Sequence, residues 1–188
     1  MTIDTSEKGL ESLIVTAMTG VFQAPPTHTG VVAERQTAYG GTGWILGHPR
    51  DYDRDYAVDL VQLAAFVNAT QPGAVDALDL DNASPTRQKF LARLLGEVTS
   101  RGVIDVLRHG VKHGPHHLDL FYGTPTPGNA RAEEHYAQNR FSVTRQLKYS
   151  RDETQLALDL CLFINGLPVI TFELKNSLTK QTVADAVE

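Results

Sequence analysis

Residues 158–175 read LDLCLFINGLPVITFELK, and this stretch decides the fold of the chain. It holds two apolar runs separated by an Asn-Gly dipeptide, which is a strong signal for a two-residue β-hairpin turn. Side chains alternate between the two faces of a strand. On that alternation the even-numbered positions are apolar, and the odd-numbered positions carry Asp159, Glu173 and Lys175. We therefore predict a hairpin with one face in the core and the three charged groups gathered on the other.

The register of this hairpin determines whether Asp159 and Glu173 face each other. A strict two-residue turn would pair Ile164 with Leu167. It would then set Asp159 opposite Phe172, on the wrong face. A three-residue loop, or a β-bulge in either strand, would instead set Asp159 opposite Glu173. We predict one of these two devices.

Asp159 is the single charge in the otherwise apolar segment Leu156–Ile164. A buried carboxylate without a partner costs several kcal/mol or takes up a proton. We therefore expect a compensating group beside Asp159, and the candidates are a metal ion and Lys175.

An Asp on one strand and Glu-x-Lys on the next resemble the PD-(D/E)xK motif of nucleases. The surrounding sequence is more specific. Residues 162–176 and 139–149 resemble the nuclease region of the R (restriction and motor) subunit of type I restriction enzymes. Residues 101–111 and 6–11 lie in family order, so the resemblance spans most of the chain. Leu158 stands where the family usually has Pro before the Asp, a position at which Pro carries no chemistry.

The resemblance implies an α/β fold, with a mixed β-sheet flanked by helices and a restriction-endonuclease-like core, in one domain of residues 1–188. It implies a type I site-specific deoxyribonuclease that hydrolyses double-stranded DNA with Mg²⁺ and is ATP-dependent in the complete complex. Target recognition would belong to methyltransferase and specificity subunits. ATP would be used only by motor domains outside this chain, and the Gly-rich residues 40–43 lack the Gly-Lys-Ser/Thr of a P-loop.

The expected metal site follows from the chemistry of phosphodiesters. Mg²⁺ prefers hard oxygen ligands, usually one or two carboxylates with water and phosphate oxygens. We expect Asp159, Glu173 and the backbone carbonyl of Leu174 as ligands. Lys175 would orient or help to deprotonate the attacking water. The resemblance adds a Glu from the first helix, either Glu7 or Glu11, with Glu11 preferred.

Each of these groups has a plainer interpretation. Asp159, Glu173 and Lys175 would form a structural ion pair on a half-exposed sheet. Glu7 and Glu11 would be solvated acids in the first turn of a helix, where they favour the helix dipole. The chain as a whole would then be a catalytically silent DNA-docking or assembly module with the same fold. A stand-alone repair-type nuclease is a further alternative.

Other polar groups carry weaker signals. His113, His116 and His117 are metal ligands by type, but they lack the paired spacing of a zinc site. Arg145 and Gln146 precede the hairpin and suit either contacts to DNA phosphates or an ordinary polar surface.

Composition limits the class of protein. The chain of 188 residues has a net charge of −5, which argues against a free-standing nonspecific nucleic-acid binder. We see no signal peptide and no long apolar span, so we expect a soluble, cytoplasmic protein without a membrane partner. Cys161, the single cysteine, excludes an intrachain disulfide and lies in a predicted buried strand.

The remaining elements are predicted from periodicity and from turn residues. A first helix, begun by Asp4, Thr5 or Ser6, presents an apolar stripe of Leu10, Leu13, Ile14, Ala17 and Val21. We expect a loop with short strands over residues 23–50, helices near 55–69, 86–100 and 102–109, strands at 118–122 and 141–149, and a loop at 124–128. A last helix with apolar positions 183, 184 and 187 reaches Glu188 without a stop signal, so we expect an N-terminal fragment of a longer protein.

Overall fold

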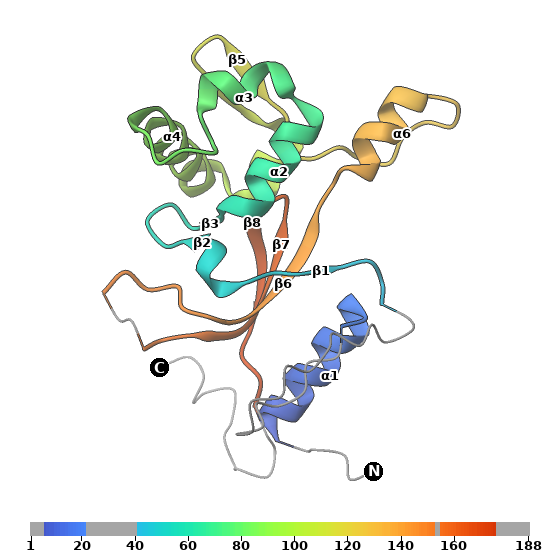
Figure 1. Cartoon of the computed structure of the whole chain (residues 1–188), viewed down its shortest axis with the longest axis vertical. Helices are drawn as coiled ribbons and strands as arrows, with labels where there is room; N and C mark the ends of the chain where they lie inside the picture. Colours follow the sequence, from blue (N-terminus) through green and yellow to red (C-terminus); the bar gives the residue numbers. More distant parts are fainter. Residues whose placement is uncertain (1–5, 22–40, 153–154, 176–188) are drawn as a thin grey trace.

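The computed structural model describes residues 6–21, 41–152 and 155–175, which form an α/β structure (Figure 1). The predicted C-terminal helix lies outside the described residues. Along the chain the elements are α1 (Glu7–Thr19), β1 (Ile45–Leu46), the 3-10 helix η1 (Pro49–Asp51), β2 (Tyr52–Asp53), β3 (Val58–Asp59), α2 (Leu60–Thr70), α3 (Pro72–Leu78), α4 (Pro85–Arg101), α5 (Val103–His109), β4 (Val111–His113), β5 (His116–Leu118), α6 (Ala130–Ala137), β6 (Phe141–Leu147), β7 (Leu158–Ile164) and β8 (Leu167–Phe172).

The main sheet has four strands in the order β1-β6-β7-β8. The short β1 runs parallel to β6, whereas β6, β7 and β8 are antiparallel neighbours. The sheet is therefore mixed, and helices flank it, as predicted. Two further pairs, β2 with β3 and β4 with β5, form small antiparallel ribbons. Figure 1 shows α2, α3 and α4 gathered at one end of the long strands and α1 at the other.

The hairpin of β7 and β8 uses both a tight turn and a bulge. Ile164 pairs with Leu167 across a two-residue turn. The register then shifts, because Phe163 pairs with Pro168 whereas Leu162 pairs with Ile170. The predicted bulge is confirmed, and the alternative three-residue loop is not used. Beyond the last pair of the ladder, this register brings Asp159 to the level of Glu173.

The turn residue Asn165 is fully buried and links three segments. Its amide nitrogen donates to the carbonyl of Leu120 at 2.9 Å and to the side-chain oxygen of Asn139 at 3.0 Å. Its side-chain oxygen accepts the backbone N–H of Arg140 at 2.6 Å. The hairpin turn is thereby tied to the loop before α6 and to the start of β6.

Both faces of β7 are covered. Leu160 and Leu162 pack with Val15 of α1, whereas Cys161 and Phe163 are buried on the opposite face. The prediction of one apolar and one charged face is therefore wrong for the middle of β7. It is also wrong for β8, where Ile170 and Phe172 are exposed.

Cys161 is buried, as the sequence predicted for its strand, and burial removes water from around the thiol. This desolvation raises the pKa of the Cys161 thiol to about 12. A thiol is a poor nucleophile while it stays protonated, so Cys161 is a packing residue.

The largest hydrophobic cluster lies among α2–α5, the β4–β5 ribbon and the hairpin turn. Its fully buried members include Leu63, Phe66 and Phe90. Leu167, the first residue of β8, belongs to this cluster and so connects the sheet to the helices.

Helix α1 begins at the predicted N-cap Ser6, whose hydroxyl accepts the N–H of Gly9. Its buried face differs from the predicted stripe. Leu10 and Leu13 are 44% and 57% exposed, whereas Glu11 and Val15 are buried. A helix that buries a charged residue needs a partner from elsewhere in the fold, which the amphipathic pattern does not reveal.

Several other predicted elements have the right type but different bounds. Helix α2 starts five residues later than expected, at Leu60, and β5 ends at Leu118 instead of beginning there. Helices α4 and α5 and strand β6 match their predictions closely, and residues 124–126 have no regular structure. Helices α3 and α6 were not predicted. Within the predicted loop 23–50, the described part contains β1 and the start of η1.

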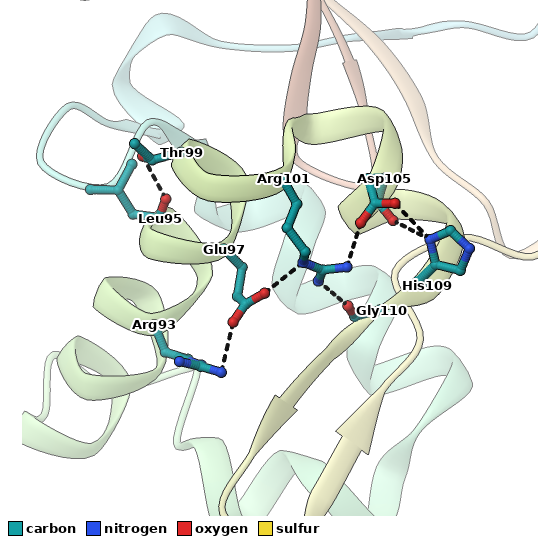
Figure 2. Close-up of polar contacts among 8 residues, drawn as sticks. All are labelled: Arg93, Leu95, Glu97, Thr99, Arg101, Asp105, His109 and Gly110. Atoms are coloured by element: carbon teal, nitrogen blue, oxygen red, sulfur yellow. Dashed lines mark hydrogen bonds and ion pairs between the residues drawn. The ribbon is translucent and has the colours of Figure 1, made fainter.

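An ion-pair network fixes the corner between α4 and α5 (Figure 2). Arg101 bonds Glu97 at 2.6 Å and Asp105 at 2.5 Å, and it also donates to the carbonyl of Gly110 at 2.9 Å. Arg93 and His109 extend the network by bonding Glu97 and Asp105 respectively. The network thus joins α4, α5 and the residue before β4.

Candidate active site

Asp159 lies near the start of β7, and both of its carboxylate oxygens accept hydrogen bonds. Oδ2 accepts the backbone N–H of Leu174 at 2.6 Å, and Oδ1 accepts from the side-chain amide of Gln146 at 3.2 Å. Asp159 is partly buried. Of the two candidate compensating groups, Lys175 pairs with Glu173, and the hydrogen-bond donors to Asp159 are neutral. Compensation by a metal ion stays a prediction.

The Glu-x-Lys segment follows directly after β8, which ends at Phe172. Lys175 Nζ lies 3.3 Å from Glu173 Oε1, and both side chains are partly exposed to solvent. Leu174, between them, points its N–H at Asp159. The hairpin therefore brings Asp159, Glu173 and Lys175 into one neighbourhood, with Leu174 as the direct link.

Glu11 reaches the same neighbourhood from α1. Its side chain is 2% exposed and forms an ion pair with Arg145 Nε. Its second oxygen accepts from the Gln146 amide at 2.9 Å. Gln146 thus stands between two carboxylates, Glu11 and Asp159, and donates to both.

A local change in backbone conformation allows this arrangement. Gln146 has φ of 46° within β6, in the left-handed region. Neighbouring residues of a regular strand point to opposite faces, yet Arg145 and Gln146 both bond Glu11. The left-handed residue turns two consecutive side chains toward one carboxylate.

The contacts of Arg145 and Gln146 with Glu11 were not predicted. The sequence suggested either that these two residues contact DNA phosphates or that they lie on an ordinary polar surface. The signal available in the sequence was weak. It consists of two adjacent long polar residues in a strand that otherwise alternates.

The expected ligands fit the chemistry of Mg²⁺. Asp159, Glu173 and the Leu174 carbonyl are hard oxygen donors, and two carboxylates with a carbonyl suit an ion that keeps several waters. Over the described part of the chain, no group of three or more His, Cys, Asp or Glu residues is placed to hold a metal ion. Glu11 is engaged by Arg145 and Gln146, so its role as a ligand stays a prediction.

The other candidate groups lie elsewhere. Glu7 occupies the first turn of α1, one turn before Glu11. The three histidines lie on the β4–β5 ribbon. The His113 ring packs edge-on against Phe90, and His117 lies 3.5 Å from Asp119.

One protein family matches the part of the chain that contains most of this site. The family model described as "Type I restriction enzyme R protein N terminus" matches residues 123–188. The matched residues make up 66 of the 188 residues, which is less than half of the chain. The matched part includes α6 and strands β6, β7 and β8, and therefore Gln146, Asp159, Glu173 and Lys175. The resemblance seen in the sequence is confirmed over these residues.

The match to the restriction R family has clear bounds. The segments 6–11 and 101–111, which were also compared with the family, lie outside the matched residues, and so does Glu11. Comparisons with curated proteins and with solved structures gave no match. Among the described helices, none is both long and apolar enough to cross a membrane.

Proposed function

We propose that this chain is the DNA-cleaving domain of a type I restriction R protein and hydrolyses phosphodiester bonds of double-stranded DNA with Mg²⁺. The observation that carries the proposal is the position of Asp159, which the Leu174 N–H holds beside the Glu-x-Lys segment. A structural ion pair between Lys175 and Glu173 would not require the backbone between them to bind a second acidic residue. The family match over these strands supports the same function.

Each residue has a distinct role in the proposal. Asp159, Glu173 and the Leu174 carbonyl would hold Mg²⁺, which supplies positive charge for the phosphate and for activating water. Lys175 would donate hydrogen bonds to the attacking water or to a phosphate oxygen, and its positive charge would offset the charge that develops in the transition state. The exposure of Glu173 and Lys175 leaves this edge of the site open to a polymer substrate.

The rest of the activity is proposed to lie outside this chain. The net charge of −5 favours DNA binding that depends on a larger assembly. Motor domains of the complete R protein would use ATP to translocate DNA, and methyltransferase and specificity subunits would recognise the target. Such an assembly would act in the cytoplasm.

The experiment compares plasmid cleavage by the complete R protein, assembled with its partner subunits, Mg²⁺ and ATP, between wild type and Lys175→Ala. General acid–base and electrostatic contributions of one side chain are worth roughly 10²–10⁴-fold, so we expect Lys175→Ala to lower cleavage by at least about 100-fold. ATP hydrolysis should be unchanged. Lys112→Ala, an exposed lysine of β4, is the matched control and should cut normally. Normal cutting by Lys175→Ala would overturn the proposal and favour the silent docking or assembly module.

A further inference from the structure

Gln146 is the one non-glycine residue with a left-handed backbone inside a described strand of the main sheet. The ladder between β6 and β7 pairs Arg145 with Leu160 and Leu147 with Leu158, on either side of it. Gln146 therefore lies across from Asp159. A left-handed conformation is strained for a non-glycine residue, so the contacts that it permits must offset that strain.

Those contacts use the full donor capacity of the Gln146 amide. The –NH₂ group has two hydrogens, and it lies 2.9 Å from Glu11 Oε2 and 3.2 Å from Asp159 Oδ1. Both partners are carboxylates, which accept hydrogen bonds and do not donate them when ionised. The orientation of the amide is thereby fixed by chemistry, because the flipped amide would turn its oxygen toward two acceptors.

Glu11 gives this link a rigid support. The carboxylate is buried, and Arg145 neutralises the oxygen that Gln146 does not bond. Arg145 itself also reaches Ser12 of α1 at 3.3 Å. The amide is thus held on one side by an anchored helix, and it orients the Asp159 carboxylate on the other.

We infer that Gln146 is a positioning residue for Asp159, and that Glu11 acts through Gln146 to fix the metal-binding carboxylate. The inference rests on the proposed nuclease function. Gln146 and the Leu174 N–H hold one oxygen of Asp159 each, so the plane of the carboxylate is set from β6 on one side and from the segment that follows β8 on the other. Groups that orient metal ligands in this way typically change metal affinity or activity by 10- to 100-fold when removed.

The test uses Gln146→Met, which keeps the length of the side chain and removes both donors. In the complete R protein with its partners, we expect the Mg²⁺ concentration for half-maximal plasmid cleavage to rise about 10- to 100-fold. ATP hydrolysis should stay at the wild-type level. Gln88→Met, on an exposed position of α4, is the matched control and should leave the Mg²⁺ dependence unchanged.

A second variant and a second readout keep the test decisive. Gln146→Gly removes the amide while favouring the left-handed backbone, so it should fold and show the same shift. Binding of Mn²⁺ to the complete R protein, followed by calorimetry without DNA, should weaken by a similar factor in both variants. A folded Gln146→Gly protein with wild-type metal affinity would overturn the inference.

The outcome is distinguishable from failure of the nuclease proposal. If Lys175→Ala cuts normally, the nuclease proposal fails, whatever Gln146 does. If Lys175→Ala abolishes cleavage and both Gln146 variants keep the wild-type Mg²⁺ dependence, the nuclease proposal stands. In that case Gln146 only joins α1 to the sheet.

Discussion

Gly166, in the hairpin turn, lies against the first turn of α2. A Cβ atom at this position would lie 2.5 Å from the carbonyl oxygen of Asp59 and 2.7 Å from the backbone nitrogen of Leu63. The Gly166 carbonyl in turn accepts the N–H of Asp59 at 2.8 Å. The absence of a side chain therefore lets the turn dock on the helix, and this docking places β7, with Asp159, relative to the main core.

We expect Gly166→Ala to lower the free energy of unfolding by about 2–5 kcal/mol. The left-handed φ of 84° costs an alanine about 1–2 kcal/mol, and the overlap with backbone atoms adds about 1–3 kcal/mol. Gly128→Ala is the matched control, since Gly128 has φ of 86° and nothing within 4 Å of its Cβ position. Gly128→Ala should lower the free energy of unfolding only by the cost of the left-handed φ, about 1–2 kcal/mol. Urea denaturation of the three proteins measures both values, and equal losses would show that close packing at Gly166 is unimportant.

At the scale of elements, helix α2 begins at a buried carboxylate. Asp59 is 1% exposed, and its Oδ1 accepts the N–H of Gln62 at 3.0 Å. Burial raises the pKa of Asp59 above its usual 3.8, and Asp51 adds to the rise, against the opposing effect of the helix N–H groups. Between 3.8 and the raised value, the folded protein binds more protons than the unfolded chain. Stability contributed by this group therefore falls as the pH rises through that window.

Asp59→Asn should stabilise the protein at pH 7, because asparagine keeps the helix cap and removes the buried charge. The gain should shrink as the pH falls from the raised pKa of Asp59 to 3.8, and its pH-dependent part should be lost below 3.8, where the aspartate is protonated in both states. Asp59→Ala loses the cap as well, at about 1 kcal/mol, and separates the two effects. Urea unfolding at several pH values between 3 and 8 measures the difference. A gain for Asp59→Asn that does not vary with pH would contradict the assignment.

The elements that could be predicted are those with local signals. Helix α4 is bounded by Ser84 and Gly102, a hydroxyl cap and a glycine with positive φ, and the hairpin follows from its turn and its two-residue period. The bulge was predictable because Asp159 and Glu173 had to share a face. The face of α1 was not predictable, because Glu11 is buried by a partner 134 residues away. The contacts of Gln146 with Glu11 and Asp159 were not predictable for a related reason. They depend on a left-handed backbone within a strand, which no pattern of residues in the sequence predicts.

At the scale of the molecule, the described chain has hydrophobic clusters of unequal size. The large one joins α2–α5 to the hairpin turn, whereas α1 joins the sheet through a small cluster whose buried members are Val15, Val143, Leu160 and Leu162. Elements with fewer buried apolar contacts open at lower free energy than the main core. The candidate site lies on the side of the sheet that α1 supports through Glu11, so its geometry depends on the less stable part of the fold.

We therefore expect the amides of α1 to exchange with solvent deuterium faster than those of α2, which opens only with the main core. Glu11→Gln should speed exchange in α1 further and leave α2 unchanged. Hydrogen bonds to charged groups contribute about 1.5–3 kcal/mol, which corresponds to roughly a 10- to 150-fold increase in local opening. Hydrogen exchange followed by mass spectrometry measures both helices in one sample. Glu134→Gln, on an exposed position of α6, is the control and should change neither. Equal protection of α1 and α2 in the wild type would mean that the two clusters unfold as one unit, and the support of Asp159 through Glu11 would then be as stable as the core itself.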